Sequence, residues 1–251
     1  MTAHYDTYDY PSYWIGREYE HASEVYALKS LLEKIPEIKS VADLGAGYGR
    51  LTPFYIYRAK KIYLTDPSSK LLETAKKKYI KNKKINVIHS KLENLPGKIR
   101  KNSLDLAIMI RVLHHIPDTI QAFNVISTLI KPHGYLILEF PNKRHLKAVL
   151  SEFFQGNFTF PLDIFPKEVS TKKRRKKTIP FLNYHPEIIV HQLNECGFKI
   201  IEKRSISNIR IPYFKEIFPV SFLVSIEKHL QKPLSYLNFG PSIMLLAQKR
   251  D

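Results

Sequence analysis

Three glycines alternate directly after a short apolar run, in the segment DLGAGYG at residues 43–49. The run that leads into them, Val41–Leu44, has the length and composition of a buried strand. Glycine permits positive φ angles and lets a ligand lie directly against the backbone. The segment therefore predicts a strand, a ligand-binding loop and then a helical stretch from Arg50, as in α/β proteins.

Further apolar runs follow this first strand at regular intervals. The predicted strands are Ile62–Thr65, Asn86–His89, Leu104–Ile110, Tyr135–Phe140 and Phe198–Lys203, with a last β-like run at 241–250. Helical periodicity lies between them, over Ile116–Ile130 and Pro186–Cys196. Strands that alternate with helices predict βαβ units and a mainly parallel sheet.

The spacing of the glycines argues against a dinucleotide ligand. The dinucleotide fingerprint needs its third glycine at position 50, where this chain has Arg50. S-adenosylmethionine carries no pyrophosphate, but it carries a cationic amino acid arm and a sulfonium. Asp43 offers a carboxylate suited to an ammonium group. Asp66, which ends the second strand, can accept hydrogen bonds from both ribose hydroxyls.

The sequence resembles the class I S-adenosylmethionine-dependent methyltransferases, in the branch similar to the quinone-biosynthesis methyltransferases. The matching blocks are VADLGAGYGR (41–50), IYLTDPSSKLL (62–72), LENLP (92–96) with LDLAIMIRVLHHIPD (104–118), and LIKPHGYLILEFPN (129–142). The resemblance implies a Rossmann-like, seven-stranded, mostly parallel sheet with helices on both faces. Its strand order would be 3-2-1-4-5-7-6, with the last strand antiparallel.

The resemblance also implies roles for individual residues. It assigns the cofactor to Asp43, Gly45, Ala46, Gly47, Asp66, Pro67, Leu92, Glu93, Ile110 and Arg111. Lys91 stands where related enzymes often have an Asp that contacts the adenine amino group, so that contact passes to a backbone carbonyl or to Glu93. The segment Tyr13–Tyr19 is similar to one that folds over the cofactor. Arg17 in it is expected to pair with the methionine carboxylate, or else the segment is a surface helix packed on the core.

Candidate residues for the acceptor side lie beyond the fourth strand. His115 and Tyr184 are the predicted catalytic residues, with His114 and His185 as further candidates. The alternative for the histidine pair is that one packs on the next helix and the other caps its start. No third ligand lies at recognisable spacing, so no metal is expected. The sulfonium methyl is already activated, so a general base is needed only for a protonated acceptor.

Two insertions, 142–185 and 208–240, are expected to form a small helical and loop cap over the acceptor. Their Phe, Tyr and Pro content favours a small, hydrophobic or aromatic metabolite as acceptor. RNA, with tRNA as the example, is the alternative, because the net charge is +17 and Lys172–Lys177 reads KKRRKK. That run could contact RNA or lipid headgroups, or be a solvated segment. A non-catalytic member of the fold is the third hypothesis, against which the intact glycines and both carboxylates argue.

The whole chain is expected to form one domain. Its parts would be an N-terminal segment over the cofactor (1–37), a cofactor-binding half (38–142), acceptor-side insertions (143–240) and a final strand (241–251). The single cysteine, Cys196, cannot form an internal disulfide. No apolar run reaches the roughly 18–20 residues that span a bilayer. We therefore expect a soluble, cytoplasmic protein.

Overall fold

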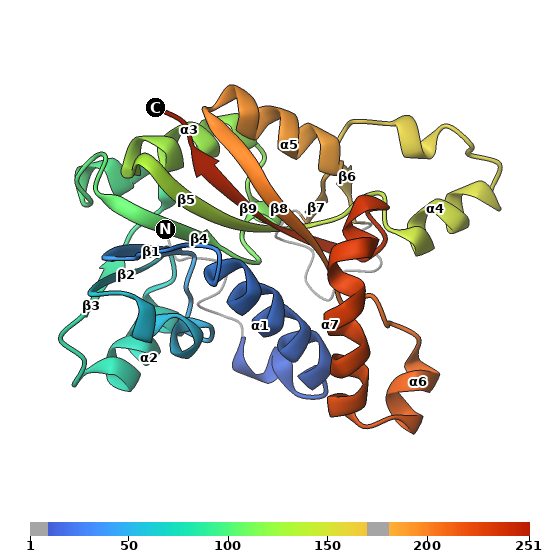
Figure 1. Cartoon of the computed structure of the whole chain (residues 1–251), viewed down its shortest axis with the longest axis horizontal. Coiled ribbons are helices and arrows are strands. Elements are labelled where there is room, and N and C mark those ends of the chain that lie inside the picture. Colours follow the sequence, from blue (N-terminus) through green and yellow to red (C-terminus); the bar gives the residue numbers. More distant parts are fainter. Residues whose placement is uncertain (1–9, 170–180) are drawn as a thin grey trace.

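The computed structural model describes residues 10–169 and 181–251, and its centre is a seven-stranded sheet (Figure 1). The strands are β1 (Ser40–Leu44), β2 (Lys61–Asp66), β3 (Ile85–His89), β4 (Leu104–Met109), β5 (Ile130–Pro141), β8 (Phe198–Ile206) and β9 (Ser242–Lys249). Their order is β3-β2-β1-β4-β5-β9-β8, and only β9 runs antiparallel to its neighbours. The predicted fold class and strand order are confirmed. A separate small sheet pairs β6 (Lys167–Glu168) with β7 (Leu182–Asn183).

Helices cover both faces of the sheet. They are α1 (Glu18–Leu32), α2 (Ser69–Tyr79), α3 (Thr119–Leu129), α4 (Leu146–Phe153), α5 (Pro186–Glu195), α6 (Pro212–Ile217) and α7 (Val220–Tyr236). In Figure 1, α1, α2 and α7 lie below the sheet, while α3 and α5 lie above it. No helix in the described part of the chain is long and apolar enough to cross a membrane.

The core follows the alternation of side chains along each strand. In β4, Ala107 and Met109 pack with α3 and α5, whereas Leu106 and Ile108 pack with α1 on the opposite face. Successive strand side chains point to opposite faces, so a strand that is buried on both sides needs apolar residues throughout. This requirement explains why β4 reads as a continuous apolar run.

The structure corrects one predicted element. Residues after Arg50 do not form an α-helix; they form two 3-10 turns, Thr52–Phe54 and Ile56–Arg58. The Tyr55 side chain between these turns is buried and donates a hydrogen bond to Asp43. That tertiary contact, together with Pro53 in the first turn, replaces the regular helix that the local pattern predicts.

Candidate functional site

The glycine loop is held against the second strand by its own backbone. The amides of Gly45 and Ala46 both donate to the carbonyl of Thr65 in β2, at 2.8 and 2.9 Å. Gly45 and Gly47 have φ angles of +77° and +56°, in the left-handed region that favours glycine. The loop therefore turns sharply at the carboxyl edge of the sheet, where ligands of open α/β folds bind.

Asp66 ends β2 and is buried beside this loop. Its carboxylate accepts a hydrogen bond from the backbone N–H of Gly47 at 2.9 Å and another from that of Ser68 at 2.7 Å. The sequence interpretation assigns Asp66 to the ribose alone and gives no hint of these two backbone contacts. Asp66 therefore fixes the conformation of the glycine loop and of the start of α2 at the edge of the cavity.

Asp43 lies deep in the same region, in β1. Its carboxylate accepts a hydrogen bond of 2.6 Å from the Tyr55 hydroxyl. Burial raises the pKa of Asp43 to about 6, against the lowering effects of Tyr55 and Arg50. Burial makes the ionised form of this carboxylate unfavourable. A cationic ligand beside it would favour the ionised form, so the site suits a cation.

A cavity of about 860 Å³ opens at this edge of the sheet and brings most of the predicted residues together. Those that line it are Asp43, Gly45, Ala46, Gly47, Asp66, Pro67, Leu92, Glu93, Ile110, Arg111 and His115. Leu92 and Glu93 come from the 3-10 turn Leu92–Gly97, which follows β3. Lys91, at the departure from the family pattern, also lines the cavity. The volume is in the range of small-molecule sites.

Sequence reasoning missed a charged cluster beside the cavity. Glu24 in α1 is buried and forms ion pairs with Arg50, just after the glycines, and with Arg111, just after β4. Burial raises the pKa of Glu24, but the Arg111 and Arg50 guanidinium groups outweigh it and hold that pKa below its usual range. Glu24 is far from both arginines in the chain, so no local spacing could have revealed the cluster.

Arg111 adopts a strained backbone conformation at this cluster. Its φ angle is +60°, which is uncommon for a residue with a side chain. Its backbone N–H donates to the buried carboxylate of Glu139 at 2.8 Å, and its Nε donates to Glu24 at 2.7 Å. Two buried carboxylates thus hold the residue that follows β4 against the cavity. Strain that surrounding structure maintains in this way is typical of binding sites.

The N-terminal segment reaches the cavity, although not through Arg17. The Trp14 ring lies against both arginines of the cluster, 3.7 Å from the Arg50 guanidinium carbon and 4.7 Å from that of Arg111. Tyr10 lines the cavity. Arg17 is not among the lining residues, and its guanidinium lies over the Tyr13 ring instead. Arg50 and Arg111, in contrast, do line the cavity.

On the acceptor side, only one of the two predicted catalytic residues lines the cavity. His115 does so, at the end of the short turn Leu113–His115. Tyr184 is buried, and its hydroxyl donates to the carbonyls of Ile116 (2.5 Å) and Leu113 (3.3 Å). Tyr184 therefore supports the histidine turn from behind and does not face the cavity, which favours a structural role for it.

The second histidine of the pair packs in the interior. His114 stacks on Phe181 with ring centroids 4.2 Å apart, and burial holds its pKa well below the usual value. Its neutral ring therefore serves packing, in line with the alternative interpretation of the pair. His185 is also buried, and it hydrogen-bonds the Pro161 carbonyl at 3.2 Å. Over the residues that the structure describes, no group of three metal-ligating side chains occurs.

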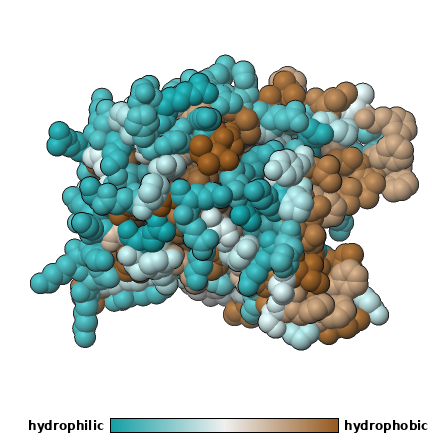
Figure 2. Space-filling view, in the orientation of Figure 1, coloured by the Kyte–Doolittle hydropathy of each residue, from teal (hydrophilic) through white to brown (hydrophobic). Residues whose placement is uncertain are grey.

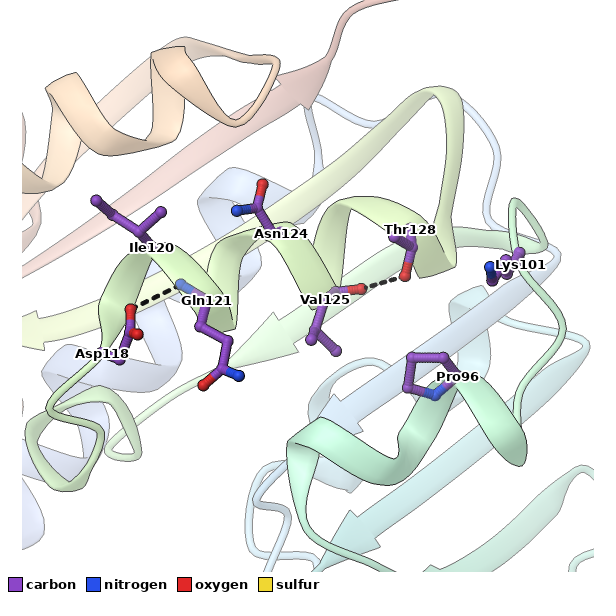
Figure 3. Close-up of a pocket in the computed structure, with 8 residues that line it drawn as sticks. All are labelled: Pro96, Lys101, Asp118, Ile120, Gln121, Asn124, Val125 and Thr128. Atoms are coloured by element: carbon purple, nitrogen blue, oxygen red, sulfur yellow. Dashed lines mark hydrogen bonds between the residues drawn. The ribbon is translucent and has the colours of Figure 1, made fainter.

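A second hollow, of about 560 Å³, lies over α3 and the turn that carries Pro96 (Figure 3). Two of its polar side chains are already used locally. Asp118 accepts from the Gln121 N–H as the helix cap, and the Thr128 hydroxyl donates to the Val125 carbonyl. The arrangement is that of an ordinary helix surface, and the larger cavity is the candidate site.

Comparison with known proteins agrees with this geometry. A family model described as a methyltransferase domain matches residues 42–138, which contain the glycine loop, Asp66 and the His115 turn. Among curated proteins, Probable polyketide synthase 42 of Dictyostelium discoideum is 26% identical over 159 residues, which cover 51% of this chain. The chain spans only 6% of the length of that protein.

Solved structures share the fold. An S-adenosylmethionine-dependent methyltransferase from Mesorhizobium loti is 16% identical, with a TM-score of 0.63, covering 92% of this chain and 100% of that one. Magnesium protoporphyrin IX methyltransferase from Synechocystis, solved with bound SAH, is 18% identical, with a TM-score of 0.56, covering 92% and 83%. Residues 42–138 therefore match a methyltransferase domain, and the chain has the fold of solved S-adenosylmethionine-dependent methyltransferases.

Proposed function

We propose that the chain binds S-adenosylmethionine in the 860 Å³ cavity and transfers its methyl group to a small, hydrophobic or aromatic metabolite. The observation that carries the proposal is the placement of two buried carboxylates, Asp43 and Asp66, on either side of a glycine loop with positive φ angles. One carboxylate suits the ammonium of the cofactor and the other suits its ribose hydroxyls. The solved relative with bound SAH has the same fold.

The residues around the loop divide the binding task. In the proposal, Asp43 pairs with the ammonium group, and the Arg50 and Arg111 guanidinium groups attract the carboxylate of the same amino acid arm. Asp66 accepts from the ribose while it holds the Gly47 amide. Leu92 and Glu93 lie where the adenine would be. The cofactor supplies an activated methyl group, and the chain orients it toward the acceptor.

The acceptor is expected to lie beside His115. This side chain ends the turn after β4 and lines the same cavity as the glycine loop. A neutral imidazole there can accept a proton from an acceptor hydroxyl or amine as the new bond forms. Correct orientation and exclusion of water supply most of the expected acceleration, because proximity alone is worth several orders of magnitude.

Support for an apolar acceptor comes from apolar side chains that line the cavity, among them Leu92, Ile110, Val112 and Ile116. The Synechocystis relative is named for magnesium protoporphyrin IX, a planar molecule, as its substrate. We infer an acceptor with an extended apolar part for this chain.

RNA is the second candidate, and the net charge of +17 favours it. The basic run Lys172–Lys177 that motivates it lies outside the described residues. One labelling experiment separates the two candidates. The chain is incubated with methyl-tritiated S-adenosylmethionine and an extract of its source cells, which is then divided into organic-soluble, RNA and protein fractions. Label in the organic-soluble fraction supports the proposal, and label in RNA supports the alternative. The Asp66→Ala variant serves as the background.

A further inference from the structure

Helix α4 presents its apolar side to solvent. Leu146, Leu150, Phe153 and Phe154 recur at helical spacing along it and at its end, and Phe154 is 82% exposed. None of the residues of α4 is buried. A helix with such a stripe normally packs it against the core of its own domain. Here the stripe is left open to solvent by the residues that the structure describes.

The segment that follows α4 continues this surface. Phe158, Leu162, Ile164 and Phe165 are all exposed, and Leu162 and Phe165 are 77% and 74% exposed. In Figure 2 the brown colour of apolar residues gathers at the right of the view, where α4 lies in Figure 1, whereas the left of the view is mostly teal.

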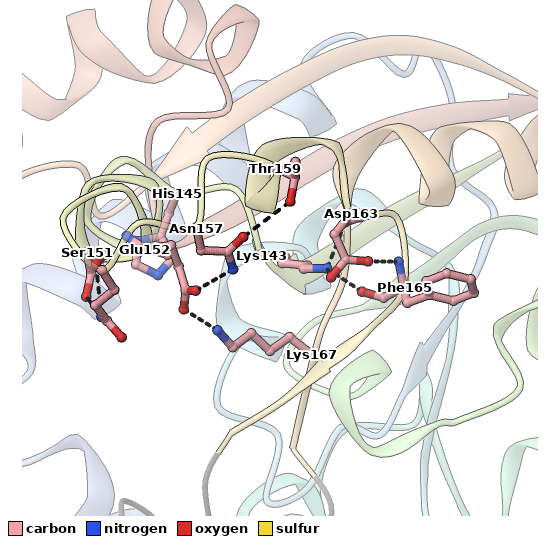
Figure 4. A network of polar contacts seen from close by, with 11 residues as sticks. Lys143, His145, Ser151, Glu152, Asn157, Thr159, Asp163, Phe165 and Lys167 are labelled. Atoms are coloured by element: carbon pink, nitrogen blue, oxygen red, sulfur yellow. Dashed lines mark hydrogen bonds and ion pairs between the residues drawn. The ribbon is translucent and has the colours of Figure 1, made fainter.

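The conformation of this segment is fixed by a buried lysine. The Nζ of Lys143 donates to the carbonyls of Asp163 and Phe165, both at 2.7 Å, and pairs with the Asp163 carboxylate at 2.6 Å (Figure 4). The Lys143 side chain is almost fully buried. A buried ammonium with three oxygen partners is costly to disrupt. The apolar side chains of the segment are therefore held outward by a specific interaction.

A second group of exposed apolar residues lies on the same side of the molecule as α4 (Figure 1). It comes from α6 and the first turns of α7 and consists of Ile211, Tyr213, Phe214, Ile217, Phe218, Val220, Phe222 and Ile226. The Leu146 amide at the start of α4 donates to the carbonyl of Phe239, which follows α7, so α4 is tied to the same part of the chain that carries the second group. We call the two groups together the apolar face.

The chemistry of the apolar face indicates its partner. Large exposed apolar surfaces mark contacts with proteins or membranes, and amphipathic helices with aromatic residues bind the membrane interface. The charge of the chain decides between them. The net charge is +17, and exposed Lys147 and Lys228 come from the helices that carry the face, whereas Lys167 pairs with Glu152. Anionic lipid headgroups attract a basic surface with apolar side chains of this kind.

We propose that the apolar face docks on an anionic membrane surface, with α4 and the 158–165 segment inserted at the headgroup level. This face is built from segments that follow the carboxyl ends of β5 and β8, the same edge of the sheet at which the cavity opens. Docking therefore places the cavity mouth near the lipid. The inference does not depend on the identity of the acceptor.

Sedimentation with lipid vesicles tests the proposal. The full chain is mixed with vesicles of phosphatidylcholine alone, or of phosphatidylcholine with 30% phosphatidylglycerol (roughly the anionic content that attracts basic interfacial proteins). We expect binding to the anionic vesicles that weakens with salt. Replacing Phe154, Phe158 and Phe165 with Ser should lower that binding by about tenfold or more, because three inserted aromatic side chains are removed.

The matched control replaces Ile80 and Tyr57 with Ser, since these are 80% and 64% exposed but lie outside the apolar face. This control variant should bind vesicles as the unchanged chain does, and both variants should keep their melting temperature and their affinity for SAH. Absence of wild-type binding to anionic vesicles overturns the proposal. Full retention of vesicle binding by the triple variant also overturns it. A third contrary result is a concentration-dependent dimer that the triple variant abolishes, with no binding to vesicles; it would assign the face to a second copy of the chain.

Discussion

Gly45 and Val112 approach so closely that no side chain fits between them: a Cβ built on Gly45 would lie 2.3 Å from Cγ2 of Val112. Gly45 belongs to the loop after β1, and Val112 follows β4, the neighbouring strand. The contact therefore joins the two adjacent strand ends that form the floor of the cavity.

Gly45→Ala should lower the free energy of unfolding by about 2–4 kcal/mol, because the cost of a positive φ angle for alanine adds to the cost of the overpacked contact with Val112. It should also weaken cofactor binding. Gly197→Ala is the matched control, since Gly197 has a φ of +86° but open space within 4 Å of where its Cβ would be. That control should cost only about 1–2 kcal/mol. Equal losses in the two variants, measured by urea unfolding, would show that the contact with Val112 is unimportant.

Asp66→Ala should lose affinity for SAH and stability together. The carboxylate holds two backbone amides, so its removal leaves the Gly47 and Ser68 N–H groups without their acceptor. The binding loss should be about 1.5–3 kcal/mol, measured by calorimetry. Asp66→Asn keeps one carbonyl oxygen and should fall between the wild type and Asp66→Ala. Unchanged affinity in a folded Asp66→Ala protein would refute the ribose role.

Cofactor binding should depend on pH through Asp43. Its pKa is about 6 in the folded chain, so the ionised form that pairs with an ammonium group becomes scarce below that pH. The affinity should fall by about tenfold for each pH unit below 6. Asp43→Asn should bind weakly at every pH, and a wild-type profile that is flat between pH 5 and 8 would argue against the pairing.

The Asp43 carboxyl also makes the stability of the cofactor-free protein depend on pH, and this stability should fall over the pH range in which cofactor affinity rises. A folded pKa above the unfolded value means that the folded chain binds more protons between about pH 4 and 6. The free energy of unfolding of the cofactor-free protein should therefore decrease as pH rises through this window. In Asp43→Asn this part of the pH dependence should vanish, which thermal unfolding at pH 4.5 and 7 can measure.

Glu24→Gln should destabilise the chain strongly. Glu24 is the carboxylate that pairs with both Arg50 and Arg111, and removing its charge leaves two largely buried cations together. Breaking a buried pair in this way costs about 3–5 kcal/mol. Glu37→Gln is the control, because Glu37 forms an ion pair with Lys39 but is 65% exposed. The control should change the melting temperature little.

Neutralising Lys172–Lys177 should separate the two acceptor classes. An RNA-binding chain would lose tRNA affinity, and the salt dependence of binding would flatten by about 0.7–0.9 log units for each phosphate that the variant no longer neutralises. We expect only weak tRNA binding at physiological salt and an unchanged affinity for SAH. Tight, salt-sensitive tRNA binding that disappears in the variant would overturn the preference for a small acceptor.

The sheet and the cofactor loop could be predicted because their causes are local. A strand that is buried on both faces must be apolar throughout, as β4 is, and a turn with positive φ angles needs glycine, as at Gly45 and Gly47. Asp66 can be found for the same reason, because the end of the second strand fixes its place.

The features that could not be predicted from the sequence depend on contacts between distant parts of the chain. No spacing links Glu24 to Arg111, which lies 87 positions away. The turns after Arg50 replace a helix because Tyr55 reaches Asp43. The stripe on α4 has the periodicity of a helix that packs on a core, and only the fold shows that it faces outward.

The place of β9 in the sheet has a consequence for folding. This strand comes last in the described chain, yet it lies between β5 and β8. Its partner Leu138 in β5 is more than 100 positions from Leu245 in sequence, so loop-closure entropy makes this pairing slow to form. Until it forms, β5 has one unpaired edge and β8 has two, and such edges promote aggregation. Nascent or truncated chains that lack residues 242–249 should therefore be the species that most need chaperones.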